Sequence, residues 1–275
     1  MRASTIPGLL LVPLLACAGA PVRPAQPRLP LTLTYFGVAG WQISDGKHVI
    51  LVDPYFSRPG DPWKDPSDPH AVAARAPPKA DLVLVGHNHP DHALDAPAVA
   101  LRTGAKLVGS FALAQQASKE GVPDDHLLPV KGGEDLEFDG FSVRVIPSLH
   151  SRTGFANGMD VETFAFLIRL AGHELLVFGT ANFIEREVAG LRPDAIIVAH
   201  GLREEIHDYT CRLLRAVGSP AEVLTTHFDA WKKPPETPLS DVVKAELADF
   251  ADEVHRCAPG TRVRVPQPSV AFPLE

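Results

Sequence analysis

The chain has 275 residues, of which 45% are hydrophobic and 21% are charged. This composition is ordinary for a folded protein with a large core, and it excludes a disordered chain, a collagen-like chain and a coiled coil. The formal net charge of −7 lacks the basic footprint of a nucleic-acid-binding protein, so we expect no nucleic-acid partner. Twelve histidines against three cysteines direct attention to imidazole chemistry.

Residues 1–30 have the pattern of an export signal followed by a tether. One cation precedes an apolar run at 6–16, which is shorter than the ~20 residues that a membrane-spanning helix needs. The segment Leu14–Cys17 is similar to a bacterial lipobox, whose cysteine becomes the lipidated first residue. We therefore predict an exported protein, periplasmic or anchored to a membrane by a lipid on Cys17, with one folded domain at 31–275.

The two other cysteines, Cys211 and Cys257, have two open interpretations. In an oxidising compartment they can form a disulfide. Two unpaired buried thiols fit the sequence equally well, and nothing in the spacing decides between the two.

From residue 31 onward, short apolar strands are interspersed with helices, which indicates an α/β or α+β fold. The expected strands are Leu31–Phe36, Trp41–Ser44, His48–Val52, Asp81–Val85, Lys106–Val108, Phe141–Ile146, Thr163–Leu170, Glu174–Phe178, Ala195–Ala199, Glu222–Thr226 and Arg262–Val265. The expected helices are Ala93–Leu101, Phe111–Glu120, Ile184–Leu191, Glu205–Val217 and Ser240–His255.

A stretch rich in proline and aspartate, Pro54–Pro78, is expected to be an irregular loop rather than a domain boundary. Its aromatic residues Tyr55, Phe56 and Trp63 have two interpretations. They form an apolar wall over a site, or, as we favour, they anchor the loop to the core.

A dense histidine cluster directly follows the apolar run at 81–85. The chain reads HNHPDH at 87–92, which places His87, His89, Asp91 and His92 within six residues. On a tight loop at a strand end, such side chains can point in different directions: His87 and His89 toward one ion, Asp91 and His92 toward a second. Imidazole and carboxylate are usual ligands of zinc and also suit iron or manganese. A polar surface turn rarely repeats histidine so densely.

HNHPDH after a hydrophobic strand resembles the metallo-β-lactamase superfamily of hydrolases, and the resemblance extends over about 31–270. Within the superfamily, the arrangement is most similar to the branch that contains ascorbate-6-phosphate lactonase and N-acylphosphatidylethanolamine phospholipase D. The supporting segments are Thr34–Trp41 and Ile50–Phe56 upstream, and Ile146–Ser151 and Val223–Trp231 downstream.

The resemblance implies a four-layer αββα sandwich with a metal site at one edge, between the two sheets. It implies that His87, His89 and His150 bind a first metal ion, and that Asp91, His92 and His227 bind a second. Zinc is the expected metal, with one or two ions per chain, and Mn²⁺ or Fe²⁺ are alternatives.

One position departs from the family pattern. After the strand at 174–178 the family places Gly-Asp, whose aspartate bridges the two metals, whereas this chain reads Gly179-Thr180-Ala181-Asn182. A threonine hydroxyl is a poor ligand and brings no negative charge. Asn182 supplies a neutral oxygen instead, or the enzyme works with one metal, or the site is catalytically dead. We favour one tightly bound metal and a weaker second one.

Further residues are expected around the site. His200 and His207 lie where the family forms its active-site rim, so either is a candidate for substrate contact, and His200 is also a candidate replacement ligand. Asp53 ends a strand and is expected to orient a metal-bound histidine. The loop Ser151–Asp160, with Arg152, either holds an anionic substrate group or is a plain connection. The remaining histidines are expected at the surface: His48, His70, His126, His173 and His255.

The implied chemistry is hydrolysis by a metal-activated hydroxide, because a metal lowers the pKa of bound water to about 7. Asp91 would orient the water or accept its proton, and His207 would assist at the substrate. The expected substrate is a small molecule or a lipid with an ester, lactone or phosphodiester bond. Two other classes stay open: a non-catalytic metal- or ligand-binding module on a degenerate hydrolase fold, and an iron-dependent oxidoreductase. The sequence leaves the oligomeric state undefined.

Overall fold

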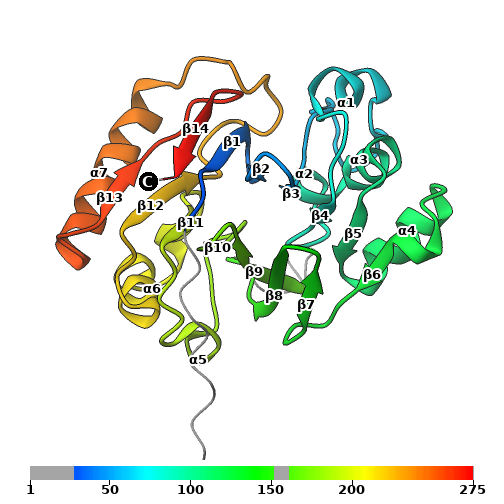
Figure 1. Cartoon of the computed structure of the whole chain (residues 1–275). Coiled ribbons are helices and arrows are strands. Elements are labelled where there is room, and N and C mark those ends of the chain that lie inside the picture. Colours follow the sequence, from blue (N-terminus) through cyan, green and yellow to red (C-terminus); the bar gives the residue numbers. More distant parts are fainter. Residues whose placement is uncertain (1–27, 152–160, 275) are drawn as a thin grey trace, which may run out of the picture.

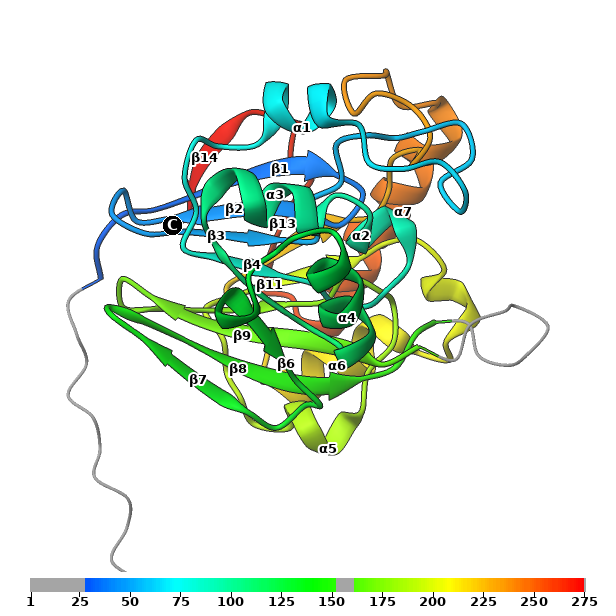
Figure 2. The same ribbon diagram turned by 90° about the vertical axis from the view of Figure 1, so that its right-hand side faces the viewer.

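The computed structural model describes residues 28–151 and 161–274. In this part of the chain, two seven-stranded sheets pack face to face. Helices cover the two outer faces, with α1, α3 and α4 on one side and α5, α6 and α7 on the other (Figures 1 and 2). The expected αββα sandwich is therefore confirmed.

The first sheet carries the N-terminal half and one strand from the C-terminus. Its strands pair antiparallel from β14 to β3 and parallel from β3 to β6. In spatial order they are β14 (Ala271–Leu274), β1 (Leu31–Gly37), β2 (Gly40–Ser44), β3 (Val49–Val52), β4 (Leu82–Leu84), β5 (Lys106–Gly109) and β6 (Leu127–Pro129).

The second sheet is parallel from β13 to β10 and antiparallel from β10 to β7. In spatial order its strands are β13 (Arg262–Arg264), β12 (Glu222–Thr226), β11 (Ala195–Ala199), β10 (His173–Val177), β9 (Thr163–Leu170), β8 (Phe141–Ser148) and β7 (Asp135–Phe138). The helices are α1 (Pro69–Arg75), α2 (Pro90–Ala93), α3 (Ala96–Thr103), α4 (Phe111–Lys119), α5 (Glu185–Val188), α6 (Tyr209–Val217) and α7 (Asp241–Cys257), with 3₁₀ turns at Asp124–His126 and Arg203–Glu205.

Three apolar clusters hold the four layers together. The central one lies between the sheets and includes Trp41, Ile50 and Phe166, all nearly inaccessible to solvent. A second cluster packs the other face of the second sheet against α6 and α7, and a third packs the first sheet against α3 and α4. Because apolar surface leaves water on both faces of each sheet, the strands read as continuous apolar runs.

The expected strands and helices are present with shifted ends, and several elements were missed. β7 and β14 lie at sheet edges with half of their residues exposed, so neither has a strong apolar pattern. Helix α1 interrupts the expected irregular loop. The Asp68 side chain caps it by accepting the His70 N–H, and Pro69 occupies its first turn, which is a start signal visible in the sequence.

Two expectations about surface histidines are wrong. His48 and His173 are only 7% and 6% exposed. His48 contacts Asp45 and the ring of Phe141, and His173 Nε2 lies 3.0 Å from the carbonyl oxygen of Leu29. Both are buried by segments distant in sequence, which local patterns do not reveal.

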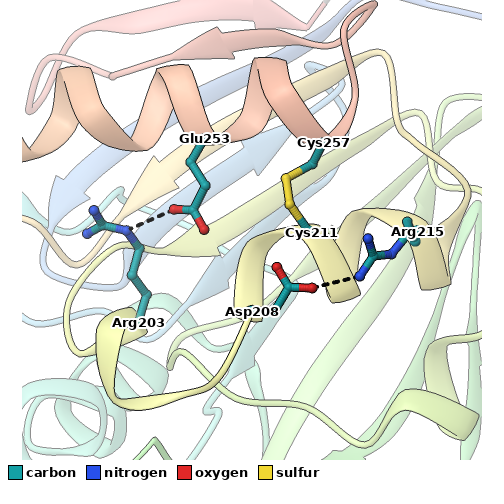
Figure 3. Close-up of a disulfide and its surroundings, with 6 residues drawn as sticks. All are labelled: Arg203, Asp208, Cys211, Arg215, Glu253 and Cys257. Carbon is teal, nitrogen blue, oxygen red and sulfur yellow. Dashed lines mark hydrogen bonds and ion pairs between the residues drawn. A yellow bond between two sulfur atoms is a disulfide. The ribbon is translucent and has the colours of Figure 1, made fainter.

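Cys211 on α6 and Cys257 at the end of α7 form a disulfide (Figure 3), so of the two open interpretations the structure supports the bridge. The bridge joins two helices of the outer layer across 46 residues of sequence. Arg203, just before α6, also lies 3.6 Å from the carboxylate of Glu253 on α7. Among the described residues, no helix is long and apolar enough to cross a bilayer.

The double variant Cys211→Ser/Cys257→Ser should lose about 2–4 kcal/mol of unfolding free energy, because the bridge restricts the unfolded chain. Urea unfolding of oxidised and reduced protein measures this difference, and reduced wild type should behave like the variant. Identical midpoints for all three, together with free thiols in the denatured and unreduced chain, would contradict the bridge.

Candidate metal centre

The proposed metal ligands and Asp53 follow the carboxyl ends of strands, and these ends meet at one edge of the sandwich. Asp53 follows β3, His87 follows β4, His150 follows β8 and His227 follows β12. Parallel strands deliver their carboxyl ends to the same edge, which is why residues far apart in sequence gather there.

The six proposed ligands form two groups at this edge. The first is His87, His89 and His150, and the second is Asp91, His92 and His227. In each group one potential ligand atom from every residue lies within 4.8 Å of the others. The groups adjoin through His87 and His92, whose ring centroids are 3.9 Å apart.

Two histidines of the first group, His87 and His89, present ring nitrogens without partners among the described residues. Both nitrogens of His87 and Nε2 of His89 are buried and accept or donate no hydrogen bond among the described residues. Leaving a buried polar atom unpaired costs about 1–3 kcal/mol. A divalent cation would bind one of the two His87 nitrogens together with Nε2 of His89, so the residues present fit a metal ion.

The imidazoles of His87 and His89 are held neutral. Burial, followed by the nearby His92 and His89, keeps the pKa of His87 well below its ordinary value. Burial and the neighbouring His150 lower the pKa of His89 to about 4. Since only the neutral ring offers a lone pair, both residues are ready to bind a metal near neutral pH.

The second group places a carboxylate beside two imidazoles. Burial opposes ionisation of Asp91, but His92 and the hydrogen bond from His227 lower the pKa of this carboxyl overall. Burial lowers the pKa of His92, while Asp91 and Asp53 raise it, and the net direction is upward. His227 Nε2 lies 3.2 Å from Asp91 Oδ2. Asp91 is therefore a carboxylate at neutral pH.

Asp53 holds His92 from behind. One carboxylate oxygen accepts the Gly86 N–H at 2.7 Å, and the other lies 2.8 Å from His92 Nδ1. Asp53 is fully buried and has φ of +44°, a conformation that L-residues rarely adopt. Gly179 makes room for it, because a Cβ atom there would lie 2.5 Å from Asp53 Oδ2. The expected contact of Asp53 with a proposed ligand is thus present.

Gly201 similarly makes room for His227. The carbonyl oxygen of His227 accepts the Gly201 N–H at 3.0 Å, and a Cβ atom on Gly201 would lie 2.9 Å from that oxygen. His227 itself has φ of +56°. Strained backbone of this kind is retained where neighbouring structure fixes it, often at functional sites.

Asn182 and Thr180 have different surroundings. The amide of Asn182 donates to the carbonyl of His150 at 3.1 Å, and its oxygen accepts the Phe183 N–H, so this oxygen is already engaged and Asn182 does not line the cavity. Thr180 does line the cavity, where its hydroxyl lies 3.2 Å from that of Ser151.

The structure does not bring His200 and His207 to the cavity. His200 is buried behind it, with its ring edge-on to Phe250 of α7. Burial and Arg203 lower the pKa of His200. His207 is exposed, because a turn at Leu202 (φ +64°) and the following 3₁₀ turn lead the chain over the surface before α6 begins.

A cavity of about 340 Å³ opens over the two groups. Trp63, Leu202 and Trp231 form its apolar walls. Its other lining residues are His89, Asp91, His92, His150, Ser151, Thr180, Gly201 and His227. The two expectations for the aromatic residues of the Pro-rich loop are each met in part, since Trp63 borders the cavity while Tyr55 and Phe56 are buried in the core.

Sequence reasoning gave no role to Trp231 or to the arginine that positions it. Arg58 donates to the carboxylate of Asp229 at 3.0 Å and to the carbonyls of Ala230 and Lys233 at 3.1 and 2.6 Å. These contacts fix the turn that carries Trp231 against the loop that carries Trp63. The motif after His227 includes Asp229 and Trp231, but its partner Arg58 lies too far away in sequence to be recognised.

Comparison with known proteins agrees with this geometry. The β-lactamase superfamily domain family matches residues 32–201, more than half of the chain. UPF0173 metal-dependent hydrolases of Pyrobaculum calidifontis and Methylobacterium nodulans are 26% and 27% identical, over 73% and 86% of this chain and 85% and 100% of theirs.

Among solved structures, the metallo hydrolase Igni18 of Ignicoccus hospitalis has a TM-score of 0.63 at 22% identity, covering 90% of this chain and 99% of its own. That likeness establishes a shared fold. Together with the family match, it identifies the chain as a member of the metallo-β-lactamase superfamily of hydrolases.

Proposed function

We propose that this chain is an exported metal-dependent hydrolase that uses a metal-activated water on an ester, lactone or phosphodiester bond. The observation that carries the proposal is the set of buried, unpaired imidazole nitrogens of His87 and His89, of which His89 lines the cavity and His87 lies against it. Similarity to curated metal-dependent hydrolases supports the same reaction class. The resemblance to the lactonase and phospholipase branch stays a prediction.

In this proposal His87, His89 and His150 hold the tightly bound ion, for which zinc is the expected identity and manganese or iron are alternatives. When bound there, the ion would supply Lewis-acid polarisation and would lower the pKa of water to about 7. Asp91 lines the cavity as a carboxylate, so it orients water and accepts a proton. Asp53 fixes the ring of His92 beside Asp91.

The apolar walls favour a substrate with a sizeable apolar group next to the hydrolysed bond. Trp63 is 56% exposed and lies edge-on to His89, with ring centroids 5.8 Å apart. Trp63 thus has a large aromatic surface that contacts both solvent and His89, a proposed metal ligand. Covering this surface with an apolar group of the substrate would lower the free energy of the complex. The apolar walls therefore favour a lipid-derived or aryl ester over a small polar compound as the substrate.

His89→Ala should lose bound zinc and hydrolysis together, with activity lower by at least about 100-fold, because the residue would be a direct ligand. The measurements are zinc content after gel filtration and turnover of a panel of aryl esters, lactones and phosphodiesters, with zinc, manganese or iron added. The exposed His70→Ala is the control and should match wild type.

Two outcomes of that experiment would contradict the proposal. Full hydrolysis by zinc-free His89→Ala would exclude the metal mechanism. Zinc binding by wild type without turnover of any compound would favour the non-catalytic module instead.

Thr180→Asp should raise the tightly held metal from about one to about two equivalents per chain, because a carboxylate beside His92 adds the negative charge that a second cation needs. Thr180→Asn introduces a side chain with the shape of aspartate but without its charge, so this variant should keep about one tightly held metal equivalent per chain. Metal content after gentle dialysis provides the measurement, and two tight equivalents in wild type would refute the expectation.

Export is proposed from residues 1–30, of which 1–27 lie outside the described residues, and the Cys211–Cys257 bridge supports it because such bridges persist in oxidising compartments. Full-length chain expressed in a bacterium should fractionate with membranes, and Cys17→Ser should move it to the soluble periplasmic fraction. Cytoplasmic protein that keeps Met1 would contradict both export and lipidation.

A further inference from the structure

Two hydroxyl groups border the cavity between the two groups of proposed ligands. Ser151 and Thr180 both line it, although their residues are only 6% and 7% exposed. Ser151 directly follows His150. Thr180 directly follows Gly179, where a Cβ atom would lie 3.3 Å from His92 Nδ1. The pair therefore stands beside one ligand of each group.

Hydrogen bonds fix this pair in place. The Ser151 N–H donates to Thr180 Oγ1 at 3.3 Å, and the two hydroxyl oxygens are 3.2 Å apart. The side-chain amide of the neighbouring Asn182 donates to the backbone carbonyl of His150. The backbone carbonyl of Asn182 accepts a hydrogen bond from Ser148 Oγ at 3.1 Å. The segments 148–151 and 180–182 are thus joined at several points, which orders the hydroxyls before any ligand arrives.

The pair has one more proton than it uses. Each hydroxyl carries one proton, and the bond between them consumes one, whichever residue donates. No other acceptor for either hydroxyl is present among the described residues. Both residues line the cavity, so the remaining proton is available to an acceptor atom of a ligand there.

We propose that the Ser151–Thr180 hydroxyl pair donates a hydrogen bond to an oxygen of the substrate that gains negative charge during hydrolysis. The inference rests on the proposed hydrolytic function and makes Thr180 and Ser151 substrate-binding residues rather than ligands of a metal. A neutral donor aimed at a developing oxyanion stabilises it without drawing charge away from the metal ligands. The class of group recognised is a tetrahedral oxyanion.

Inorganic phosphate is a stable tetrahedral oxyanion and serves as the probe. Calorimetry would measure its Kd for the zinc-loaded protein as wild type, Thr180→Val, Thr180→Ser and Ser151→Ala. Thr103→Val is the matched control, since Thr103 is also buried but its hydroxyl donates to the Val99 carbonyl at 2.7 Å in helix α3. Zinc content is measured in every variant.

Thr180→Val and Ser151→Ala should each weaken phosphate binding about tenfold or more, because a hydrogen bond to a charged group is lost. Thr180→Ser and Thr103→Val should stay within about twofold of wild type, and zinc content should not change. An unchanged Kd in both hydroxyl-free variants would overturn the proposal, as would loss of zinc from them or absence of phosphate binding to wild type. Turnover of the ester panel by the same wild-type preparation tests the proposed function separately.

Discussion

Burial of unpaired imidazole nitrogens is the constraint around which this edge of the protein is organised. His87 is 1% exposed, and neither of its ring nitrogens has a hydrogen-bond partner among the described residues. Desolvation keeps such rings neutral, and their unpaired nitrogens raise the free energy of the folded chain. Burial of the apolar core elsewhere in the sandwich has to offset this loss of stability. A bound cation would stabilise the folded chain.

The surrounding residues hold this arrangement by contacts that reach across the fold. Asp53 links the first sheet to His92, and Gly179 of the second sheet leaves space for its carboxylate. Arg58 ties the loop after β3 to the turn after β12, so that two tryptophans border one cavity. The contacts of Asp53 with Gly179 and of Arg58 with Asp229 join segments from different sheets, which explains why the site depends on the intact sandwich.

Much of this could be predicted from the sequence, since the cluster at 87–92 follows an apolar strand and each proposed metal ligand outside it also follows one. Resemblance supplied the layer order and the partners His150 and His227. What could not be predicted depends on distant packing. The exposure of His207, the engagement of the Asn182 oxygen and the contact of Arg58 with Asp229 follow from turns whose direction no local pattern specifies. Edge strands such as β7 were missed because half-buried residues alternate weakly.

The central claim is that His87, His89 and His150 form the tighter of two metal positions. Crystals of the chain loaded with one equivalent of zinc, measured at wavelengths on both sides of the zinc absorption edge, test this most directly. We expect the strongest anomalous peak among those three imidazoles, with a weaker peak or none between Asp91, His92 and His227. A strongest peak at the second group, or zinc bound only elsewhere on the protein, would contradict it.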